Sequence, residues 1–321
     1  MGKATRNDAI GQAHSKLILI GEHAVVYNEP AIAIPFTTLK VKAKIKQIKG
    51  NVRFVSDFFT GRLDDMPEKM YGLAECVRSV CETLKEPIAN FQIDLHSSIP
   101  IGRGLGSSAA IAVSLVRGLY NFCKKDLDRE VLKKFVDLAE KYAHGNPSGI
   151  DREGTTHDHP IFFQREKKVE QVKITQPLHL VVADTGRIGD THASVANVKE
   201  QYQAEEAKTK QRIERIGELT LASRQAMESG QLIELGKQLD QAHTELQALG
   251  VSDPGLDHYV EVSKQAGALG AKLTGGGRGG CMFALARSYE HAKEIETALK
   301  DSGASNTWYC KIADEVMSYE S

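Results

Sequence analysis

The sequence predicts an α+β fold of two domains, and three observations support that prediction. The chain has 321 residues, which corresponds to roughly two domains at about 150 residues each. Its composition, 41% hydrophobic and 26% charged, is that of an ordinary globular protein. Short segments that alternate with a period of two are interspersed with longer segments of helical spacing in both halves of the chain.

Strands are expected first in the N-terminal half. Residues 16–20 and 31–36 are short apolar runs, and residues 41–48 (VKAKIKQI) alternate with a period of two. The three lysines of the alternating segment would share one face of the sheet. Such a row is more often a solvated face than a ligand-binding patch, so we interpret it as solvated.

A strand, a glycine-rich loop and two helices are expected next. Residues 91–98 (FQIDLHSS) alternate again and lead into residues 100–110 (PIGRGLGSSAA), after which residues 111–123 have helical spacing. A second helix is predicted for residues 128–143, because a glycine and a proline follow it within a few residues. The loop after that helix reads HGNPSGID, residues 144–151.

The pattern of the sequence changes near Gln176 and Pro177, where a new apolar segment begins. We therefore predict domains of residues 1–176 and 177–321. A buried strand is expected at residues 178–186, and the charged residues 191–249 are expected to be helical. The remaining predictions are a strand at 272–274, a glycine loop at 275–280, a strand at 281–286, a helix at 289–300 and a strand at 307–312.

Charge and cysteine content exclude several classes of protein. The formal net charge of −1 excludes a globally basic nucleic-acid binder. The five cysteines are scattered and do not have the spacing of a metal site, so we expect reduced, mostly buried thiols. No apolar run reaches the roughly 20 residues that span a bilayer, and the first residues do not resemble a signal peptide. We therefore expect a soluble cytoplasmic protein without a membrane or nucleic-acid partner.

The most informative segment is the glycine-rich loop before the first predicted helix. Gly102, Gly104 and Gly106 let the backbone approach an anion, and the helix start offers unpaired N–H groups. Ser107 and Ser108 add hydroxyls, a ligand type that Mg²⁺ uses between phosphates. A glycine turn before a helix is often no more than a turn, and neither the Walker pattern nor the protein-kinase loops occur here.

Charged residues beside apolar segments are weaker candidates. Lys16 stands inside an apolar strand, where a buried charge is costly, and Glu22 and His23 follow that strand. Glu140 and Asp151 flank the HGNPSGID loop, so that one could hold a metal and the other could act on a hydroxyl. Isolated carboxylates are more commonly caps or surface charges, and Lys16 could simply snorkel.

Taken together, four segments resemble the GHMP kinase family over essentially the whole chain. They are SKLILIGEHAVVYNEPAIAIP near the start, PIGRGLGSSAA and HGNPSGID in the middle, and KLTGGGRGGCMFAL near the end. The resemblance implies a ribosomal-protein-like ATP-binding domain followed by a ferredoxin-like domain. It also implies phosphoryl transfer from ATP to a small alcohol with Mg²⁺ as the cofactor.

The same resemblance implies roles for individual residues. Gly102, Arg103, Gly104, Leu105, Gly106, Ser107 and Ser108 would bind the ATP phosphates, with Ser108 and Glu140 on Mg²⁺. Asp151 would be the catalytic base, and Lys16 would pair with Asp151 and the γ-phosphoryl group. The residues implied on the substrate side are Glu22, His23, Ser148 and Thr191.

The substrate follows from fewer residues. GEHAVVY together with HGNPSGID is similar to the branch of the family that phosphorylates mevalonate, whereas galactokinases usually carry a GEHTDY-like stretch. Phosphomevalonate is the nearest alternative substrate. A silent metabolite sensor would be expected to lose the base, the lysine or the metal ligands, and a scaffold would leave the glycine loops unexplained. A homodimer is compatible with all of these interpretations.

Two departures from the family pattern are present. The first motif reads AHSK where the family commonly has APGK, which leaves the local backbone geometry open. Arg278 interrupts the third glycine loop, and it would either add positive charge near the phosphates or face solvent.

Overall fold

The computed structural model describes residues 7–144 and 148–314, so Gly145, Asn146 and Pro147 of the HGNPSGID loop lie outside the described residues. The chain forms two compact units that interleave along the sequence. Unit 1 takes the chain up to Ser15, Leu39–Ile101 and Gly106–Thr156, whereas unit 2 takes Lys16–Thr38, Gly102–Leu105 and the chain from His157 onward. The predicted domain boundary at residue 176 stays a prediction.

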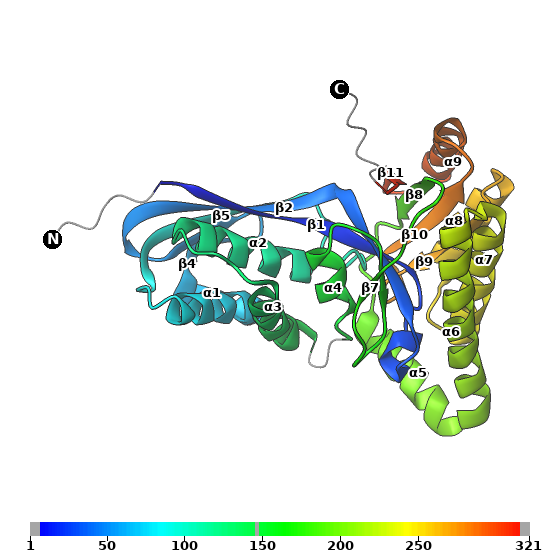
Figure 1. Cartoon of the computed structure of the whole chain (residues 1–321), viewed down its shortest axis with the longest axis horizontal. Helices are drawn as coiled ribbons and strands as arrows, with labels where there is room; N and C mark the ends of the chain where they lie inside the picture. The colour runs from blue at the N-terminus through cyan, green and yellow to red at the C-terminus, as the bar shows by residue number, and fades with distance from the viewer. Residues whose placement is uncertain (1–6, 145–147, 315–321) are drawn as a thin grey trace. The chain divides into compact units, whose positions relative to one another are not determined.

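Unit 1 combines a sheet with four helices (Figure 1). Its strands lie in the order β4-β3-β5-β2, and β1 pairs with β2. Strands β1 and β2 each continue into the residues of unit 2. The elements are β1 (Ala9–Ile20), β2 (Ala31–Asn51), β3 (Arg53–Ser56), β4 (Phe59–Arg62), α1 (Tyr71–Thr83), β5 (Ala89–Ser97), α2 (Ser107–Phe122), α3 (Arg129–His144) and α4 (Ile150–Thr156).

The alternation seen in the sequence sets the two faces of the unit 1 sheet. Val41, Ala43 and Ile45 of β2 are fully buried, while the lysines between them lie on the other face, where Lys44 pairs with Asp8 at 2.8 Å. Strand β5 runs antiparallel to β2, with Ile93 opposite Ile45. The predicted separation into an apolar and a solvated lysine face is confirmed.

Helix α2 lies directly on this sheet, and two glycines make the close approach possible. A Cβ atom at Gly11 of β1 would lie 2.0 Å from the Ser114 carbonyl oxygen of α2, and one at Gly118 would lie 3.1 Å from the Ile45 side chain. Helix α2 contacts α1, α3 and α4 in turn, and Figure 1 shows α1, α2 and α3 together on one face of the sheet. This packing places the start of α2 beside the helices that carry Glu140 and Asp151.

Unit 2 contains a four-stranded antiparallel sheet in the order β11-β8-β10-β9 and a set of long helices. Helices α8 and α9 pack on this sheet, α7 packs on β9, and α6 pairs with α7. The elements are β6 (Ile161–Phe163), β7 (Glu170–Gln171), β8 (Leu178–Asp184), α5 (Thr191–Ala204), α6 (Glu206–Ser229), α7 (Leu232–Ala248), α8 (Pro254–Gln265), β9 (Gly270–Thr274), β10 (Cys281–Ala286), α9 (Tyr289–Asp301) and β11 (Asn306–Ile312).

The core of unit 2 is apolar and continuous. Val181, Leu273 and Met282 of the sheet are fully buried against Leu246 of α7 and Ile295 of α9. Burial of apolar surface at about 25 cal/mol per Å² is what holds these otherwise charged helices to the sheet. Their opposite faces are solvated, as the sequence predicted for residues 191–249.

Two features of the elements differ from the prediction. The runs at 31–36 and 41–48 form one strand, β2, because its backbone pairing continues past the exposed Thr37 and Thr38. The charged segment forms three helices, which are separated at Glu205 and at Gly230, and the backbone of Gly230 is left-handed. Helix α2 begins at Ser107, so the two serines lie at the opening of the helix as predicted.

The α+β class is confirmed. All five cysteines are free, and four of them are buried, in agreement with the predicted reduced thiols. Within residues 7–144 and 148–314, none of the helices combines the length and the apolar character that a membrane span requires.

Candidate active site

The glycine-rich loop begins in unit 2 with a backbone that only glycine adopts readily. Gly102 and Gly104 have φ angles of 71° and 76°, in the left-handed region. A Cβ atom at Gly104 would lie 2.8 Å from the Thr274 carbonyl oxygen, and one at Gly275 would lie 2.5 Å from the Gly104 Cα. The first and last glycine loops of the sequence therefore touch backbone to backbone.

Lys16 is buried beside this contact. Its side chain is among the largest fully buried ones, with 1% of the residue exposed, and Nζ donates a 2.8 Å hydrogen bond to the Gly104 carbonyl oxygen. The Lys16 backbone N–H also donates to the Leu105 carbonyl oxygen at 3.2 Å. A buried ammonium group is costly unless it is compensated, and at this burial the Lys16 side chain does not snorkel to solvent.

Arg103 fixes the glycine loop to the segment after β8. Its Nε lies 2.9 Å from Asp184 Oδ1, and Nη2 donates to the Gly186 carbonyl oxygen at 2.9 Å. The Gly189 backbone N–H donates to the Gly102 carbonyl oxygen at 2.8 Å. Arg103 therefore supports the glycine loop with its side chain.

Two residues predicted on the substrate side, His23 and Thr191, lie at Gly276 of the last glycine loop. His23 is 7% exposed, and its Nε2 donates to the Gly276 carbonyl oxygen at 3.0 Å. Thr191 is the first residue of α5, and its Oγ1 lies 2.1 Å from where a Cβ of Gly276 would be. Burial lowers the pKa of His23 to about 4, so its imidazole is uncharged at neutral pH.

Glu22 forms a fully buried ion pair with Lys272 of β9. Lys272 Nζ donates to Glu22 Oε1 and, at 2.6 Å, to the Leu273 carbonyl oxygen. Burial raises the pKa of Glu22 and lowers the pKa of Lys272, and the attraction between the two groups opposes both shifts. The second oxygen, Glu22 Oε2, is buried and accepts no hydrogen bond from the described residues, so it can accept one from a ligand.

The other predicted residues lie in unit 1, at the start of α2 and on α3 and α4. Gly106 has a φ of 71° and precedes α2, whose first residues are Ser107 and Ser108. Ser107 is 8% exposed, and its hydroxyl has no hydrogen-bond partner among the described residues. Buried polar atoms are nearly always paired, so the Ser107 hydroxyl suits a ligand that supplies its hydrogen-bond partner.

Glu140 and Asp151 lie on the two helices that contact α2. Glu140 is 2% exposed near the end of α3, and Asp151 is the second residue of α4. Ser148, predicted on the substrate side, precedes α4, and its hydroxyl accepts a 3.4 Å hydrogen bond from the Ile150 backbone N–H. Among the residues that the structure describes there is no group of three or more metal-binding side chains.

The structure thus groups the predicted residues into two sets. Unit 1 carries Ser107, Ser108, Glu140, Ser148 and Asp151, and unit 2 carries Lys16, Glu22, His23, Gly102 to Leu105 and Thr191. The pairing of Lys16 with Asp151 would join the two sets, and it stays a prediction.

Sequence reasoning missed three residues of the unit 2 set. Lys272 carries the same signal as Lys16, a charge within an apolar strand, but was not singled out. Asp184 ends a buried strand and holds Arg103. Thr274 Oγ1 donates to the Ile18 carbonyl oxygen at 3.0 Å and accepts from the Ile18 N–H at 3.1 Å, a pairing across the sequence that no local pattern reveals.

Arg278 makes a contact that neither alternative anticipated. Its Nε donates to the Gly250 carbonyl oxygen at 3.1 Å, and its backbone N–H donates to the Val251 carbonyl oxygen at 2.9 Å. The arginine therefore fastens the last glycine loop to the segment after α7.

Comparison with known proteins agrees with this arrangement. Residues 71–152 match the GHMP kinases N terminal domain, and residues 223–305 match the GHMP kinases C terminal domain. The chain is 34% identical to the mevalonate kinase of Pyrococcus horikoshii over 316 residues, which cover 92% of both proteins.

Solved structures give the same result. A mevalonate kinase from methicillin-resistant Staphylococcus aureus is 33% identical, with a TM-score of 0.72 over 95% of this chain and 99% of that one. The Leishmania major mevalonate kinase in complex with R-mevalonate has a TM-score of 0.83 over 98% and 99% of the two chains, and at 24% identity it shows the fold alone. Because both family domains and relatives over nearly the full length agree, the chain belongs to the GHMP kinase family.

Proposed function

We propose that this chain transfers the γ-phosphoryl group of ATP to the C5 hydroxyl of mevalonate, giving 5-phosphomevalonate in the mevalonate route to isoprenoids. The observation that carries the proposal is the 34% identity to a mevalonate kinase over 92% of the chain. The buried polar groups at Glu22 and His23, together with the exposed Thr191 hydroxyl beside Gly276, support a small hydroxylated substrate, because they offer hydrogen-bonding groups in unit 2.

The ATP phosphates are proposed to bind along Gly102 to Ser108. Left-handed glycines let the phosphate oxygens approach the backbone N–H groups, and the N-terminus of α2 carries the positive end of the helix dipole. The buried Ser107 hydroxyl, which lacks a partner among the described residues, supports an acceptor arriving with the ligand.

Mg²⁺ is the cofactor that we infer, with Ser108 and Glu140 as its ligands. The donors fit, because Mg²⁺ in nucleotide sites takes one or two carboxylates and completes its oxygen shell with phosphates and water. Glu140 is a carboxylate buried to 2% exposure, on a helix that contacts α2. When bound, the ion would neutralise charge on the β- and γ-phosphates.

Asp151 is proposed to accept or orient the proton of the C5 hydroxyl, and Lys16 to pair with the γ-phosphoryl group. Phosphoryl transfer through a loose transition state needs little activation of the nucleophile, so positioning by these two groups would supply much of the rate. On the substrate side, Glu22 Oε2 would accept a hydrogen bond from a mevalonate hydroxyl, with His23 and Thr191 beside it and Ser148 shaping the loop before Asp151.

A panel of four alcohols tests the proposal directly. ADP formation from Mg²⁺ and ATP is measured with mevalonate, phosphomevalonate, homoserine or galactose as the acceptor. We expect turnover with mevalonate well above the other three, because GEHAVVY and HGNPSGID both match the mevalonate branch. Preference for phosphomevalonate would contradict the substrate and leave the kinase assignment standing.

Replacing the two inferred metal ligands gives the second prediction. Glu140→Gln and Ser108→Ala should each raise the Mg²⁺ concentration needed for half-maximal activity and lower turnover, because each removes an oxygen ligand or its charge. The measurement is a Mg²⁺ titration at saturating ATP and mevalonate. Ser114→Ala, a buried serine later in α2 whose hydroxyl bonds to Ile111, is the matched control. Unchanged titrations in both ligand variants would refute the assignment.

We also infer that the enzyme acts in the cytoplasm, where ATP is the available phosphoryl donor, on small molecules rather than on nucleic acid. A homodimer is our working proposal for the oligomeric state. Light scattering of the purified chain measures it directly.

A further inference from the structure

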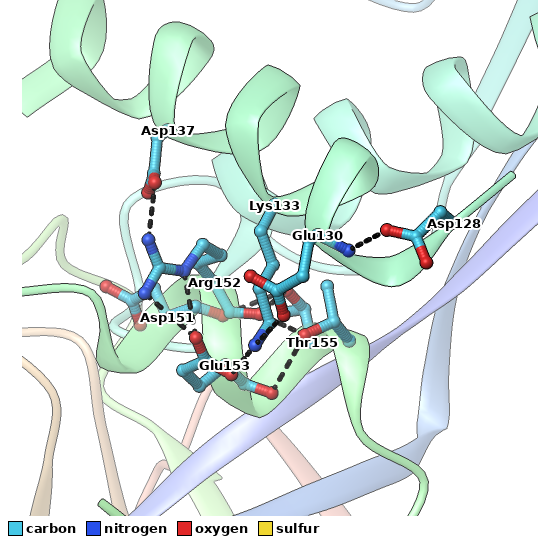
Figure 2. A network of polar contacts seen from close by, with 9 residues as sticks. Asp128, Glu130, Lys133, Asp137, Asp151, Arg152, Glu153 and Thr155 are labelled. Carbon is cyan, nitrogen blue, oxygen red and sulfur yellow. Dashed lines mark hydrogen bonds and ion pairs between the residues drawn. The ribbon is translucent and has the colours of Figure 1, made fainter. Parts of the chain in front are cut away.

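A network of ion pairs joins α4 to α3 beside the proposed catalytic base. In Figure 2, the Arg152 guanidinium lies between Asp137 of α3 and Glu153 of α4. Arg152 Nη1 donates to Asp137 Oδ2, and its Nε and Nη2 donate to Glu153 Oε1 at 3.1 and 2.8 Å. On the other side, Lys133 Nζ lies 3.2 Å from Glu153 Oε2 and 3.0 Å from Glu130 Oε1.

The centre of the network is withdrawn from water, whereas its two outer carboxylates are not. The side chain of Glu153 is only 3% exposed, and those of Lys133 and Arg152 are 16% and 23% exposed, while Asp137 and Glu130 are 43% and 73% exposed. A buried carboxylate is costly unless it is compensated, and here two cations from different helices compensate Glu153. The pairs of Glu153 are therefore part of the structure of unit 1, and Asp137 holds Arg152 from the surface side.

Helix α4 depends on such contacts for its direction. It has only seven residues, and helices of that length are not stable alone, so tertiary contacts must set its orientation. Asp151 and Arg152 are consecutive in it, and the Asp151 carbonyl oxygen accepts a 2.8 Å hydrogen bond from Thr155 Oγ1. In Figure 2 Asp151 and Arg152 lie next to each other at the start of α4, so a contact that fixes Arg152 also fixes the backbone that carries Asp151.

The partner residues on α3 belong to the stripe that carries Glu140. Glu130, Lys133, Asp137 and Glu140 are spaced by three, four and three residues, which places them on one side of a helix. The contact from Arg152 to Asp137 is therefore made about one turn before Glu140. The Arg152–Asp137 ion pair therefore fixes α4 relative to the segment of α3 that bears Glu140, the inferred metal ligand.

We propose that Arg152 is a positioning residue, which through Asp137 and Glu153 fixes the start of α4 so that the Asp151 carboxylate meets the substrate hydroxyl. This inference rests on the proposed function, since it presumes that Asp151 acts on the acceptor. Misplacing a reacting group by about 1 Å can cost about 100-fold in rate, so the positioning of Asp151 has a measurable value.

The test compares Arg152→Met, Arg152→Lys and Asp137→Asn with the parent chain. Met keeps the length of the side chain but none of its donors, and we expect kcat to fall about 10- to 100-fold, with KM for ATP and mevalonate within about twofold. Lys restores one ion pair and should recover part of kcat. Asp137→Asn removes only the charge that pairs with Arg152, keeps the Lys133–Glu153 pair between α3 and α4, and should fold even where Arg152→Met does not.

Arg212→Met is the matched control. Arg212 Nη1 donates to Glu245 Oε2 at 2.7 Å and joins α6 to α7, with both side chains partly exposed. It removes an equivalent interhelical pair away from the predicted residues, and kcat should stay at the parent value.

The outcomes separate this inference from the proposed function. A parent chain that is inert towards mevalonate would overturn the proposed function. A fully active Asp151→Asn variant would overturn the proposed role of Asp151 and this inference with it, while leaving the kinase activity standing. The positioning role alone would be overturned by a different pattern. In that pattern the parent chain is active and Asp151→Asn is inactive, but folded Arg152→Met and Asp137→Asn have the kcat of the parent. If Arg152→Met and Asp137→Asn lower the melting temperature but keep the kcat of the parent per folded molecule, the network contributes to stability alone.

Discussion

Replacing Asp151 with asparagine is expected to give a folded protein that has lost most of its turnover. Asparagine keeps the size and hydrogen-bonding capacity of the side chain but cannot accept the proton. Loss of a general base typically removes about 10² to 10⁴ of the rate, which is roughly 3 to 5 kcal/mol of barrier. Turnover is measured at saturating ATP and mevalonate, together with ATP affinity and melting temperature.

A purely structural role for Asp151 would give a different result. A lost helix cap costs about 1 kcal/mol of stability and leaves the turnover of the folded fraction intact. The hydrogen bond from Thr155 to this residue goes to the backbone carbonyl, so the substitution does not remove it. Near-normal turnover with a lowered melting temperature would return Asp151 to a structural role and make the whole HGNPSGID assignment doubtful.

Lys272→Met is expected to cause the largest loss of stability. Lys272 and Glu22 are 0% and 1% exposed as side chains, and removal of the ammonium leaves a buried carboxylate without its partner. Breaking a buried pair in this way costs about 3 to 5 kcal/mol. At about 2 to 4 °C per kcal/mol, the melting temperature should fall by about 6 to 20 °C. Turnover should fall as well, because Glu22 belongs to the proposed substrate site.

The pH dependence of that loss identifies its cause. The attraction and hydrogen bond from Lys272 both lower the pKa of Glu22, so without them burial raises it further above its ordinary value of 4.5. A carboxyl whose folded pKa lies above the unfolded value favours the folded state at low pH, and this contribution is lost as pH rises through the folded pKa. The deficit of Lys272→Met should therefore be smallest below about pH 4.5 and largest near neutral pH.

A double variant gives the control for this interpretation. Glu22→Gln combined with Lys272→Met removes both charges and should recover part of the lost stability, because no unpaired charge stays buried. A deficit that is the same at all pH values, or a double variant less stable than Lys272→Met alone, would argue that packing of the lysine stem matters more than its charge.

Much of the fold could be predicted, because the local alternation of apolar and polar residues and the positions of glycines indicate the strands and turns. The alternation of Val41, Ala43 and Ile45 with lysines identified a half-buried strand, and the glycines before Ser107 identified a turn into a helix. The run of β2 through Thr37 and Thr38 could not be predicted, because its continuity comes from pairing with neighbouring strands. The apolar pattern of the sequence was interrupted at these two threonines, whereas the strand continued through them.

The site was harder to predict, because its partners are distant in sequence. Lys16 stood out as a charge in an apolar strand, yet its bond to Gly104 spans 88 positions. The partner of Glu22 is 250 positions away, so no spacing rule connects it to Lys272. Arg152 looked like an ordinary charge beside Asp151, and only the packing of α4 on α3 gives it partners.

The interleaving of the two units along the sequence has a consequence for synthesis on the ribosome. Unit 1 is complete in sequence at Thr156, and two segments of unit 2, Lys16–Thr38 and Gly102–Leu105, lie within that stretch. Lys16–Thr38 must then await the chain from His157 onward, and at about 5 to 20 residues per second that delay is roughly 6 to 24 s. During it the apolar residues Leu17 to Ile20, which are buried in the finished protein, lack the later part of unit 2, so we expect this nascent segment to bind chaperones.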